Sequence, residues 1–223
     1  MKMKKGSDKI LSKKKVITVL EKLHHMYPDA VSELDYRSPF ELLVSTILAA
    51  QCTDVRVNQV TKTLYKKYNT PEAFLTLYEE QLGEMIRSCG FYKNKARNIL
   101  NTCRILVEEY GGKVPDDRDE LMRLPGVGRK TANVVISNAF GQAAIAVDTH
   151  VFRVSNRIGL ADSDNVDQTE QHLMKNIPEN KWSDAHHWLI YHGRRVCKAR
   201  KPLCHQCPLT DECQYYRKSI KEE

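Results

Sequence analysis

The chain has 223 residues, of which 41% are hydrophobic and 28% are charged, and its formal net charge is +7. This length and composition are typical of one large or two small globular domains. No apolar run reaches the roughly 20 residues that a membrane helix needs, and no apolar stretch of a secretory signal follows the cationic N-terminus. We therefore expect a cytoplasmic protein without a membrane partner, and the positive charge weakly favours a polyanionic one.

Helical periodicity dominates the chain. Apolar residues repeat at three- and four-residue steps, as at Val16, Val19, Leu20 and Leu23, which is the spacing of one helix face. No run of alternating apolar and polar residues favours a strand, so the predicted fold class is all-α. The expected helices cover residues 12–26, 38–50, 54–68, 71–77, 79–87, 92–110, 117–123, 128–140, 149–158, 166–176, 181–195 and a short segment near 210–217.

A turn rich in proline and glycine is expected between two of these helices. Its sequence is Leu-Pro-Gly-Val-Gly at 124–128, followed by Arg129 and Lys130. Gly126 and Gly128 permit left-handed or crowded backbone, and the N–H groups at the start of the next helix form an anion-binding arrangement suited to a phosphate. The turn therefore predicts a DNA-backbone contact, although an ordinary helix–helix turn has similar residues.

Four of the seven cysteines form a compact pattern near the C-terminus, Cys197-x6-Cys204-x2-Cys207-x5-Cys213. Without an export signal, metal ligation or burial is a better interpretation of cysteines than disulfide pairing. The spacing alone predicts four thiolate ligands and leaves zinc and an iron–sulfur cluster open. The other three cysteines are predicted to be small buried hydrophobic residues: Cys52, Cys89 and Cys103.

Three motifs in this order resemble one known family. They are LPGVGRKTANVV from residue 124, VDTH at 147–150 and the C-terminal cysteine pattern, and segments at 38–58 and 90–99 add to them. Together they closely resemble endonuclease III, the helix-hairpin-helix DNA glycosylase/AP lyase family of base excision repair. The resemblance covers roughly residues 20–217. It implies a two-lobed architecture, with a helical barrel at 32–146, a discontinuous cluster domain of 1–31 plus 147–223, and a DNA groove between the lobes.

The resemblance also assigns the chemistry. It implies that Lys130 is the nucleophile, that Asp148 is the essential acid, and that the four C-terminal cysteines hold one 4Fe-4S cluster. An attacking lysine must be neutral, although the reference pKa of lysine is about 10.4. We expect the helix start, the neighbouring Arg129 and partial burial to favour the neutral amine. Asp148 also precedes a helix, where a carboxylate commonly caps the backbone. The alternative interpretation of Lys130 is a surface lysine that contacts a phosphate of the DNA.

The expected partner is double-stranded DNA that contains oxidised pyrimidines or abasic sites, bound by a monomer. A base inside a duplex has to be flipped out, and the resemblance suggests that Gln51 and Phe91 fill the vacated space. Phe91 is equally interpretable as a core anchor between helices. The alternatives to a bifunctional glycosylase/lyase are a non-catalytic DNA-binding module and a monofunctional glycosylase. The expected DNA contacts are Gln51, Phe91, Gly126, Gly128, Arg129, Lys198, Arg200 and Lys201.

Overall fold

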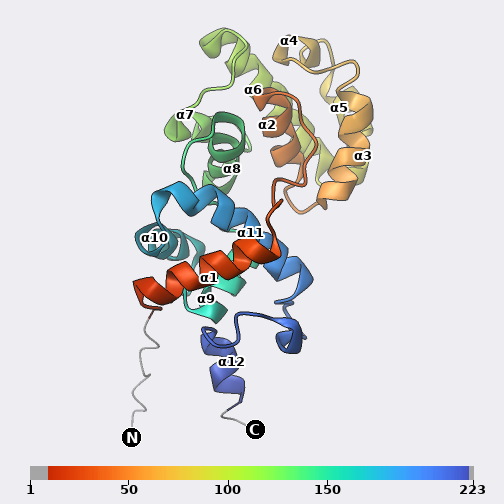
Figure 1. Cartoon of the computed structure of the whole chain (residues 1–223). Coiled ribbons are helices and arrows are strands. Elements are labelled where there is room, and N and C mark those ends of the chain that lie inside the picture. Colours follow the sequence, from red (N-terminus) through yellow and green to blue (C-terminus); the bar gives the residue numbers. More distant parts are fainter. Residues whose placement is uncertain (1–9, 221–223) are drawn as a thin grey trace, which may run out of the picture. The chain divides into compact units, whose positions relative to one another are not determined.

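The computed structural model describes residues 10–220, and every regular element in this part of the chain is a helix. The prediction of an all-α fold is therefore confirmed. No helix within these residues combines the length and the apolar character that crossing a bilayer requires. The helices form two compact units, one of residues 32–144 and the other of residues 10–31 together with 145–220 (Figure 1).

The unit of residues 32–144 is built around the buried helix α2. Ser38 caps this helix, since its side chain accepts a hydrogen bond from the backbone N–H of Glu41 at 3.2 Å, and Pro39 occupies the first turn. These are standard signals for a helix start. The helices of this unit are α2 (Pro39–Leu48), α3 (Asp54–Leu64), α4 (Pro71–Phe74), α5 (Glu79–Met85), the 3-10 turn η1 (Arg87–Cys89), α6 (Tyr92–Tyr110), α7 (Arg118–Met122) and α8 (Arg129–Phe140).

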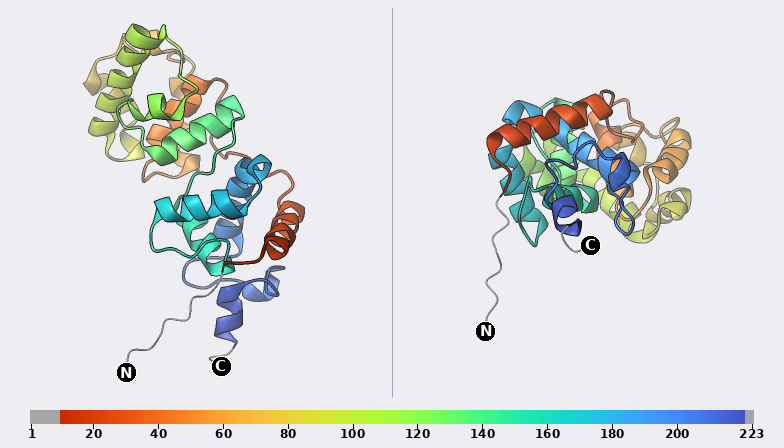
Figure 2. Two further views of the ribbon diagram at one scale, coloured as in Figure 1. Left: turned by 90° about the vertical axis from the view of Figure 1, so that its left-hand side faces the viewer. Right: turned by 60° about the horizontal axis from the view of Figure 1, so that its bottom comes forward.

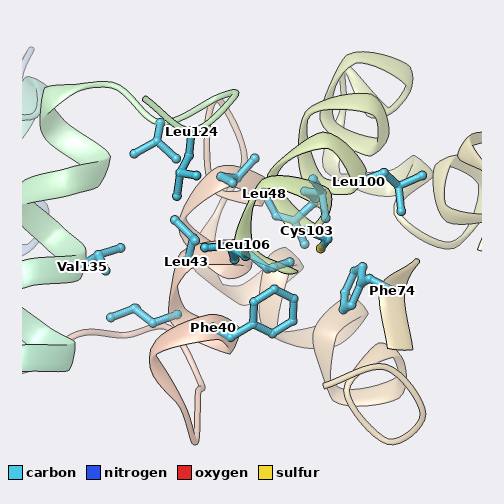
Figure 3. Close-up of a cluster of buried hydrophobic side chains, with 14 of the residues drawn as sticks. Phe40, Leu43, Leu48, Phe74, Leu100, Cys103, Leu106, Leu124 and Val135 are labelled. Atoms are coloured by element: carbon cyan, nitrogen blue, oxygen red, sulfur yellow. The ribbon is translucent and has the colours of Figure 1, made fainter. Parts of the chain in front are cut away.

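The core of this unit lies between α2, α6 and α8. Figure 3 shows Phe40, Leu43 and Leu48 of α2 with Leu106 of α6 and Val135 of α8 in one cluster. Each of these side chains is at most 5% exposed. Fully burying a side chain of this size contributes about 1.5–3 kcal/mol. Because α2 is buried on nearly all sides, it fixes the start of α3 and the preceding loop as well as the position of α8.

The second unit packs α1 and α9 against α11, and a cysteine-bearing loop follows α11. Figure 2 shows α1 beside this group of helices although it comes from the N-terminal end of the chain. Lys22 of α1 also forms a 2.8 Å ion pair with Glu212, which lies between Cys207 and Cys213. The helices of this unit are α1 (Lys13–Met26), α9 (Thr149–Ile158), α10 (Val166–Asn176), η2 (Glu179–Lys181), α11 (Trp182–Arg195), η3 (Cys204–Gln206) and α12 (Gln214–Ser219).

Several observed helix ends differ from the predicted ones by one to three residues, and two differ by about four. Helix α3 ends at Leu64 instead of residue 68, and residues 65–67 form a turn. Helix α12 begins at Gln214, whereas a helix over 210–217 was predicted. The second shift has a local cause, since the backbone N–H groups of Glu212 and Cys213 both donate to the carbonyl of Leu209 in a turn that delays the helix.

Candidate active site and iron–sulfur centre

The predicted hairpin is present between α7 and α8. The backbone N–H of Val127 donates to the carbonyl of Leu124 at 3.1 Å, and the hydroxyl of Thr102 on α6 donates to the carbonyl of Pro125 at 3.0 Å. Gly128 is the N-cap of α8 and supplies no side-chain cap. The backbone N–H groups in the first turn of α8 therefore receive no side-chain acceptor from the N-cap. Such N–H groups can donate to a bound anion instead.

The two hairpin glycines have different structural roles. Gly126 has a φ of +80°, and a Cβ there would lie 3.0 Å from the side-chain nitrogen of Asn98. Only glycine adopts such backbone without strain. Gly128 has a φ of −93°, and no atom lies within 4 Å of the position that a Cβ would take. The expectation of a left-handed or crowded backbone therefore holds for Gly126 and is wrong for Gly128, whose missing side chain only leaves open space in front of α8.

Lys130 is the second residue of α8 and its side chain is exposed. The expected helix start and the adjacent Arg129 are present, but the expected partial burial is not. The Lys130 ammonium makes no hydrogen bond or ion pair with any of the residues 10–220.

Asp148 caps the N-terminus of α9. Its Oδ1 accepts a hydrogen bond of 2.7 Å from the backbone N–H of Val151, and the residue is half-buried. Asp148 thus has the capping geometry that the sequence predicted. No hydrogen bond within residues 10–220 engages Oδ2, so one carboxylate oxygen is fixed by the helix while the other remains available.

Two arginines of α9 hold the loop that carries the first cysteine. Arg153 donates to the carbonyl of Cys197 from both Nε and Nη2 at 3.1 Å. Arg157 donates to the carbonyls of Lys198 and Ala199 at 2.8 Å each. Hydrogen bonds from charged donors are stronger than neutral ones. The helix that Asp148 caps therefore also fixes the cysteine loop.

All four C-terminal cysteines line one cavity. Apolar side chains, among them Leu209, complete its wall. Burial raises the pKa of the Cys207 thiol to about 11, so four thiolates would be costly here without a cationic centre. Residues 10–220 contain no group of three or more His, Cys, Asp or Glu side chains arranged around one metal-ion position. The donor set of four thiols fits a cluster that takes one thiolate at each iron, with no open site on the metal.

Two side chains approach the sulfur atoms from outside the set of four. The Nε2 of His192 lies 3.5 Å from Cys207 Sγ, and Arg157 Nη1 lies 3.6 Å from Cys197 Sγ. Burial lowers the pKa of His192 to about 4, so the imidazole is neutral near pH 7. Its Nδ1 lies 3.2 Å from the hydroxyl of Tyr27. The centre therefore has polar neighbours as well as ligands.

Three of the cations predicted to contact DNA lie in the cysteine-bearing loop. Lys198, Arg200 and Lys201 are all exposed, and none forms an ion pair with a described residue. Arg195, at the end of α11, lies over the ring of Tyr191 with 4.2 Å between the guanidinium carbon and the ring centroid. The loop thus exposes three cationic side chains to solvent, while hydrogen bonds from Arg153 and Arg157 hold its backbone.

Gln51 and Phe91 share an uncommon backbone conformation. Their φ angles are +55° and +48°, and no other non-glycine residue among those described has a positive φ. Phe91 is 65% exposed, so the interpretation of this residue as a core anchor is wrong. Such backbone costs of order 1–3 kcal/mol at each residue and concentrates at functional sites.

Sequence reasoning missed three cationic residues that organise these segments. They are Arg153 and Arg157, described above, and Lys95. Lys95 is only 5% exposed, and its Nζ donates to the carbonyls of Leu48 and Cys89 at 2.8 Å each. A charged residue on a helix is normally expected at the surface. In the sequence, only the position of Lys95 beside Ala96 and Ile99 on the apolar face of α6 could have indicated its burial.

Comparisons with known families define the class of protein. Residues 44–179 match the sequence model of the HhH-GPD superfamily base excision DNA repair protein, and residues 197–213 match that of the iron-sulfur binding domain of endonuclease III. The first match spans more than half of the chain. The second covers all four cysteines and settles the choice between zinc and iron–sulfur that the spacing left open, so the chain carries a 4Fe-4S cluster.

Individual relatives narrow the assignment. Endonuclease III of Bacillus subtilis (strain 168) is 50% identical over 214 residues, which are 96% of this chain and 98% of that protein. A non-covalent endonuclease III–DNA complex and a trapped endonuclease III–DNA covalent intermediate each match with a TM-score of 0.90 and 52% identity over 95% of this chain and 100% of the solved one. The chain therefore belongs to the endonuclease III family, as its motifs indicated.

Proposed function

We propose that Lys130 and Asp148 carry out the reaction of this family on damaged duplex DNA. The chain is a DNA glycosylase with AP lyase activity in base excision repair. The observation that carries the assignment of Lys130 is its position: it stands in the first turn of α8, exposed and without an ion-pair partner among the described residues.

The reaction starts with attack of the neutral Lys130 amine on C1′ of the damaged nucleotide. The bond from C1′ to the base breaks, and the base leaves with its electron pair. The nitrogen loses one proton, the C1′–O4′ bond breaks, and O4′ takes up a proton. The product is a protonated imine, which acidifies the hydrogens on C2′. Removal of one C2′ proton then expels the 3′ phosphate by β-elimination. Because Lys130 is exposed in the free chain, we infer that bound DNA provides the desolvation that favours the neutral amine.

Asp148 acts on the same sugar through its available oxygen. One oxygen is fixed by the Val151 N–H at 2.7 Å, so the carboxylate keeps a set orientation. A negative charge held in this way stabilises the positive charge that develops on the sugar as the base leaves, and it can also accept the proton of the lysine. The reaction needs both the amine of Lys130 and the carboxylate of Asp148.

The remaining residues bind and deform the DNA. The hairpin N–H groups around Gly126, Gly128 and Arg129 contact phosphates, which positions the protein without reading sequence. Gln51 and Phe91 enter the space that the flipped base vacates, and their exposure and left-handed backbone support this role.

The proposed substrates are oxidised pyrimidines and abasic sites in chromosomal DNA. The reaction takes place in the cytoplasm, and a monomer suffices for it. The two compact units correspond to a barrel lobe and a cluster lobe.

The iron–sulfur centre has a structural role in this proposal. The ligands are Cys197, Cys204, Cys207 and Cys213. When bound, the cluster supplies four iron–thiolate bonds that cross-link the loop and leave no metal site open for catalysis. Lys198, Arg200 and Lys201 on that loop bind phosphates. Fixed cations lose less side-chain and backbone freedom on meeting DNA than mobile ones do.

A covalent-trapping experiment tests the proposal. Borohydride reduces an imine to a stable amine, so the wild-type chain should become attached to a duplex with one oxidised pyrimidine or abasic site. Lys130→Ala should give no adduct. Lys14→Ala is the matched control, because Lys14 is also an exposed second residue of a helix, here α1. An adduct that persists in Lys130→Ala, or no adduct with the wild type, would show that the proposed nucleophile is wrong.

A further inference from the structure

Two cysteines outside the iron–sulfur centre lie in the segments that bear Gln51 and Phe91, and the two thiols interact. Cys52 directly follows Gln51, and Cys89 precedes Phe91 by two residues. Cys89 is 1% exposed and belongs to the core of its unit, while Cys52 is half-buried and packs against that core. Burial and then the neighbouring Cys52 raise the pKa of the Cys89 thiol to about 11. The expectation that all three remaining cysteines are merely buried thus fails for Cys52, which solvent can reach.

Lys95 already connects the two segments at this place. Its Nζ donates to the carbonyl of Leu48, where α2 ends, and to the carbonyl of Cys89, where η1 ends. Its pKa is lowered by burial, and this effect is opposed by the two nearby thiols, Cys52 and then Cys89. Lys95 opposes the rise in the pKa of the Cys89 thiol, but burial outweighs this effect. The cluster of Cys52, Cys89 and Lys95 therefore combines an accessible thiol, a buried partner thiol and a fixed positive charge.

We propose that Cys52 and Cys89 are a redox modification site at which a peroxide forms a reversible disulfide between the segments of Gln51 and Phe91. The disulfide itself rests on the interaction between the two thiols, since Cys89 is hydrogen-bonded to Cys52, and on Lys95, which joins their segments. Its effect on DNA repair rests on the proposed function, in which Gln51 and Phe91 enter the duplex.

The chemistry starts at Cys52 because only this thiol of the pair is accessible. Its thiolate attacks one oxygen of hydrogen peroxide, the O–O bond breaks, and a sulfenic acid and one water form. The Cys89 sulfur then attacks the Cys52 sulfur, the S–O bond breaks, and the hydroxyl group leaves as a second water. The two thiols together lose two electrons and two protons, and the peroxide is reduced to two molecules of water. A thiol reductant reverses the reaction by exchange.

The disulfide would restrict the two segments whose side chains have to adjust their position when DNA binds. Gln51 and Phe91 have the two left-handed non-glycine backbones of the described chain, and Gly90 beside Phe91 has a φ of +71°. A covalent bond one residue from Gln51 and two residues from Phe91 fixes their separation. Side chains that enter a duplex adjust their position on binding, so the oxidised protein should excise a paired damaged base more slowly.

Peptide mapping of the holoenzyme tests the bond itself. The protein is treated with increasing hydrogen peroxide, only doses that leave the visible absorption of the cluster unchanged are analysed, and free thiols are alkylated before digestion. We expect a Cys52–Cys89 linked peptide that disappears with dithiothreitol. Cys52→Ser and Cys89→Ser should each lose it, whereas Cys103→Ala should retain it, because Cys103 is a fully buried cysteine of the same unit. If Cys52 becomes sulfinic acid while Cys89 stays alkylatable, the proposed disulfide is wrong.

Excision assays on the same samples test the consequence. Oxidation should slow removal of a paired oxidised pyrimidine by roughly tenfold, a usual size for coupling between sites. Dithiothreitol should restore the rate, and Cys52→Ser should show neither change. A linked peptide without any loss of rate would overturn the coupling to the DNA-binding segments. Failure of the proposed function is recognised separately, since Lys130-dependent trapping would then be absent from the reduced protein while the linked peptide still formed on oxidation.

Discussion

The hairpin that carries Lys130 and the helix that carries Asp148 are supported by different kinds of contact. The hairpin is fixed by its backbone, with Val127 bonded to Leu124 and Gly126 in a conformation that only glycine adopts freely, and Lys130 itself is left exposed. Asp148, in contrast, is a helix cap, and the rest of α9 is tied to the cysteine loop by arginine side chains. The proposed nucleophile is thus exposed and without a contact that holds it, while the proposed catalytic carboxylate is held by the helix that it caps.

The largest effect should come from removing a proposed ligand of the iron–sulfur centre. Cys213→Ala leaves three thiolates around the shared cavity, so the visible absorption of the cluster should be lost and stability should fall by several kcal/mol, roughly 3 or more. Cys103→Ala is the control, in the unit of residues 32–144 that carries the hairpin. Because Cys103 is fully buried, it should cost about 1–2 kcal/mol through a small cavity without changing the absorption. A Cys213→Ala protein with full iron content would contradict the ligand assignment.

The next effect separates the two roles of Asp148. Asn caps helices about as well as Asp, so Asp148→Asn should keep the stability within about 0.5 kcal/mol. Loss of the charge should slow base excision by roughly 10²–10⁴-fold, as for a catalytic acid–base group. Asp148→Ala should lose activity to a similar degree and also about 1 kcal/mol of stability. Single-turnover kinetics and denaturant unfolding measure the two quantities. Normal excision by Asp148→Asn would reduce Asp148 to a cap.

A smaller effect is expected from the cations of the cysteine loop. Affinity for duplex DNA should fall linearly with salt on logarithmic axes, and each Ala substitution at Lys198, Arg200 or Lys201 should reduce the slope by about 1. Lys175→Ala on α10 makes the same change in charge on an exposed lysine elsewhere in this unit and should leave the slope unchanged. Equal slopes for wild type and the loop variants would argue that this loop does not meet phosphates.

The smallest effect concerns the pH dependence of stability in the cluster unit. Burial lowers the pKa of His187 on α11, and Asp184 opposes this only in part. The folded state therefore prefers the neutral ring. As pH falls below the unfolded pKa of about 6.5, the unfolded state binds the proton more readily and stability decreases. His187→Gln should flatten this loss in denaturant titrations from about pH 7.5 to about pH 5, and the exposed His25→Gln should not.

Much of the fold is predictable because local signals agree with the packing. Helix α6 was predicted with its observed ends, since its apolar face repeats regularly and Gly111, at a φ of +57°, stops it. The helix before the cysteine pattern, α11, was predicted to within one residue at its start and with its observed end. Helix α12 was misplaced by several residues because a turn at Leu209 precedes it, and nothing in the sequence marks that turn as stronger than the helical pattern.

The site is predictable to the extent that motifs fix it. The hairpin and the cap at Asp148 follow from local sequence, and both are where they were expected. The exposure of Lys130 and of Phe91 depends on the packing of distant segments, which periodicity does not describe. Lys95 is the clearest example of a side chain whose burial depends on other elements. Its ammonium group can be buried because the carbonyls of Leu48 and Cys89 accept its hydrogen bonds, and both carbonyls belong to elements other than α6.

The attachment of α9 to the cysteine loop has a consequence for protein engineering. A shortened enzyme that ended at Val196 would lose the carbonyl acceptors at Cys197, Lys198 and Ala199. Arg157 would then have lost both of its carbonyl acceptors, while Arg153 would keep the carbonyl of Gly193 at 3.0 Å. The repulsion between the two guanidinium groups would be offset less than before, and the residue that caps their helix is Asp148. Transplanting this carboxylate onto a smaller scaffold would therefore require the metal-binding tail as its counterpart, or neutral residues at both arginine positions.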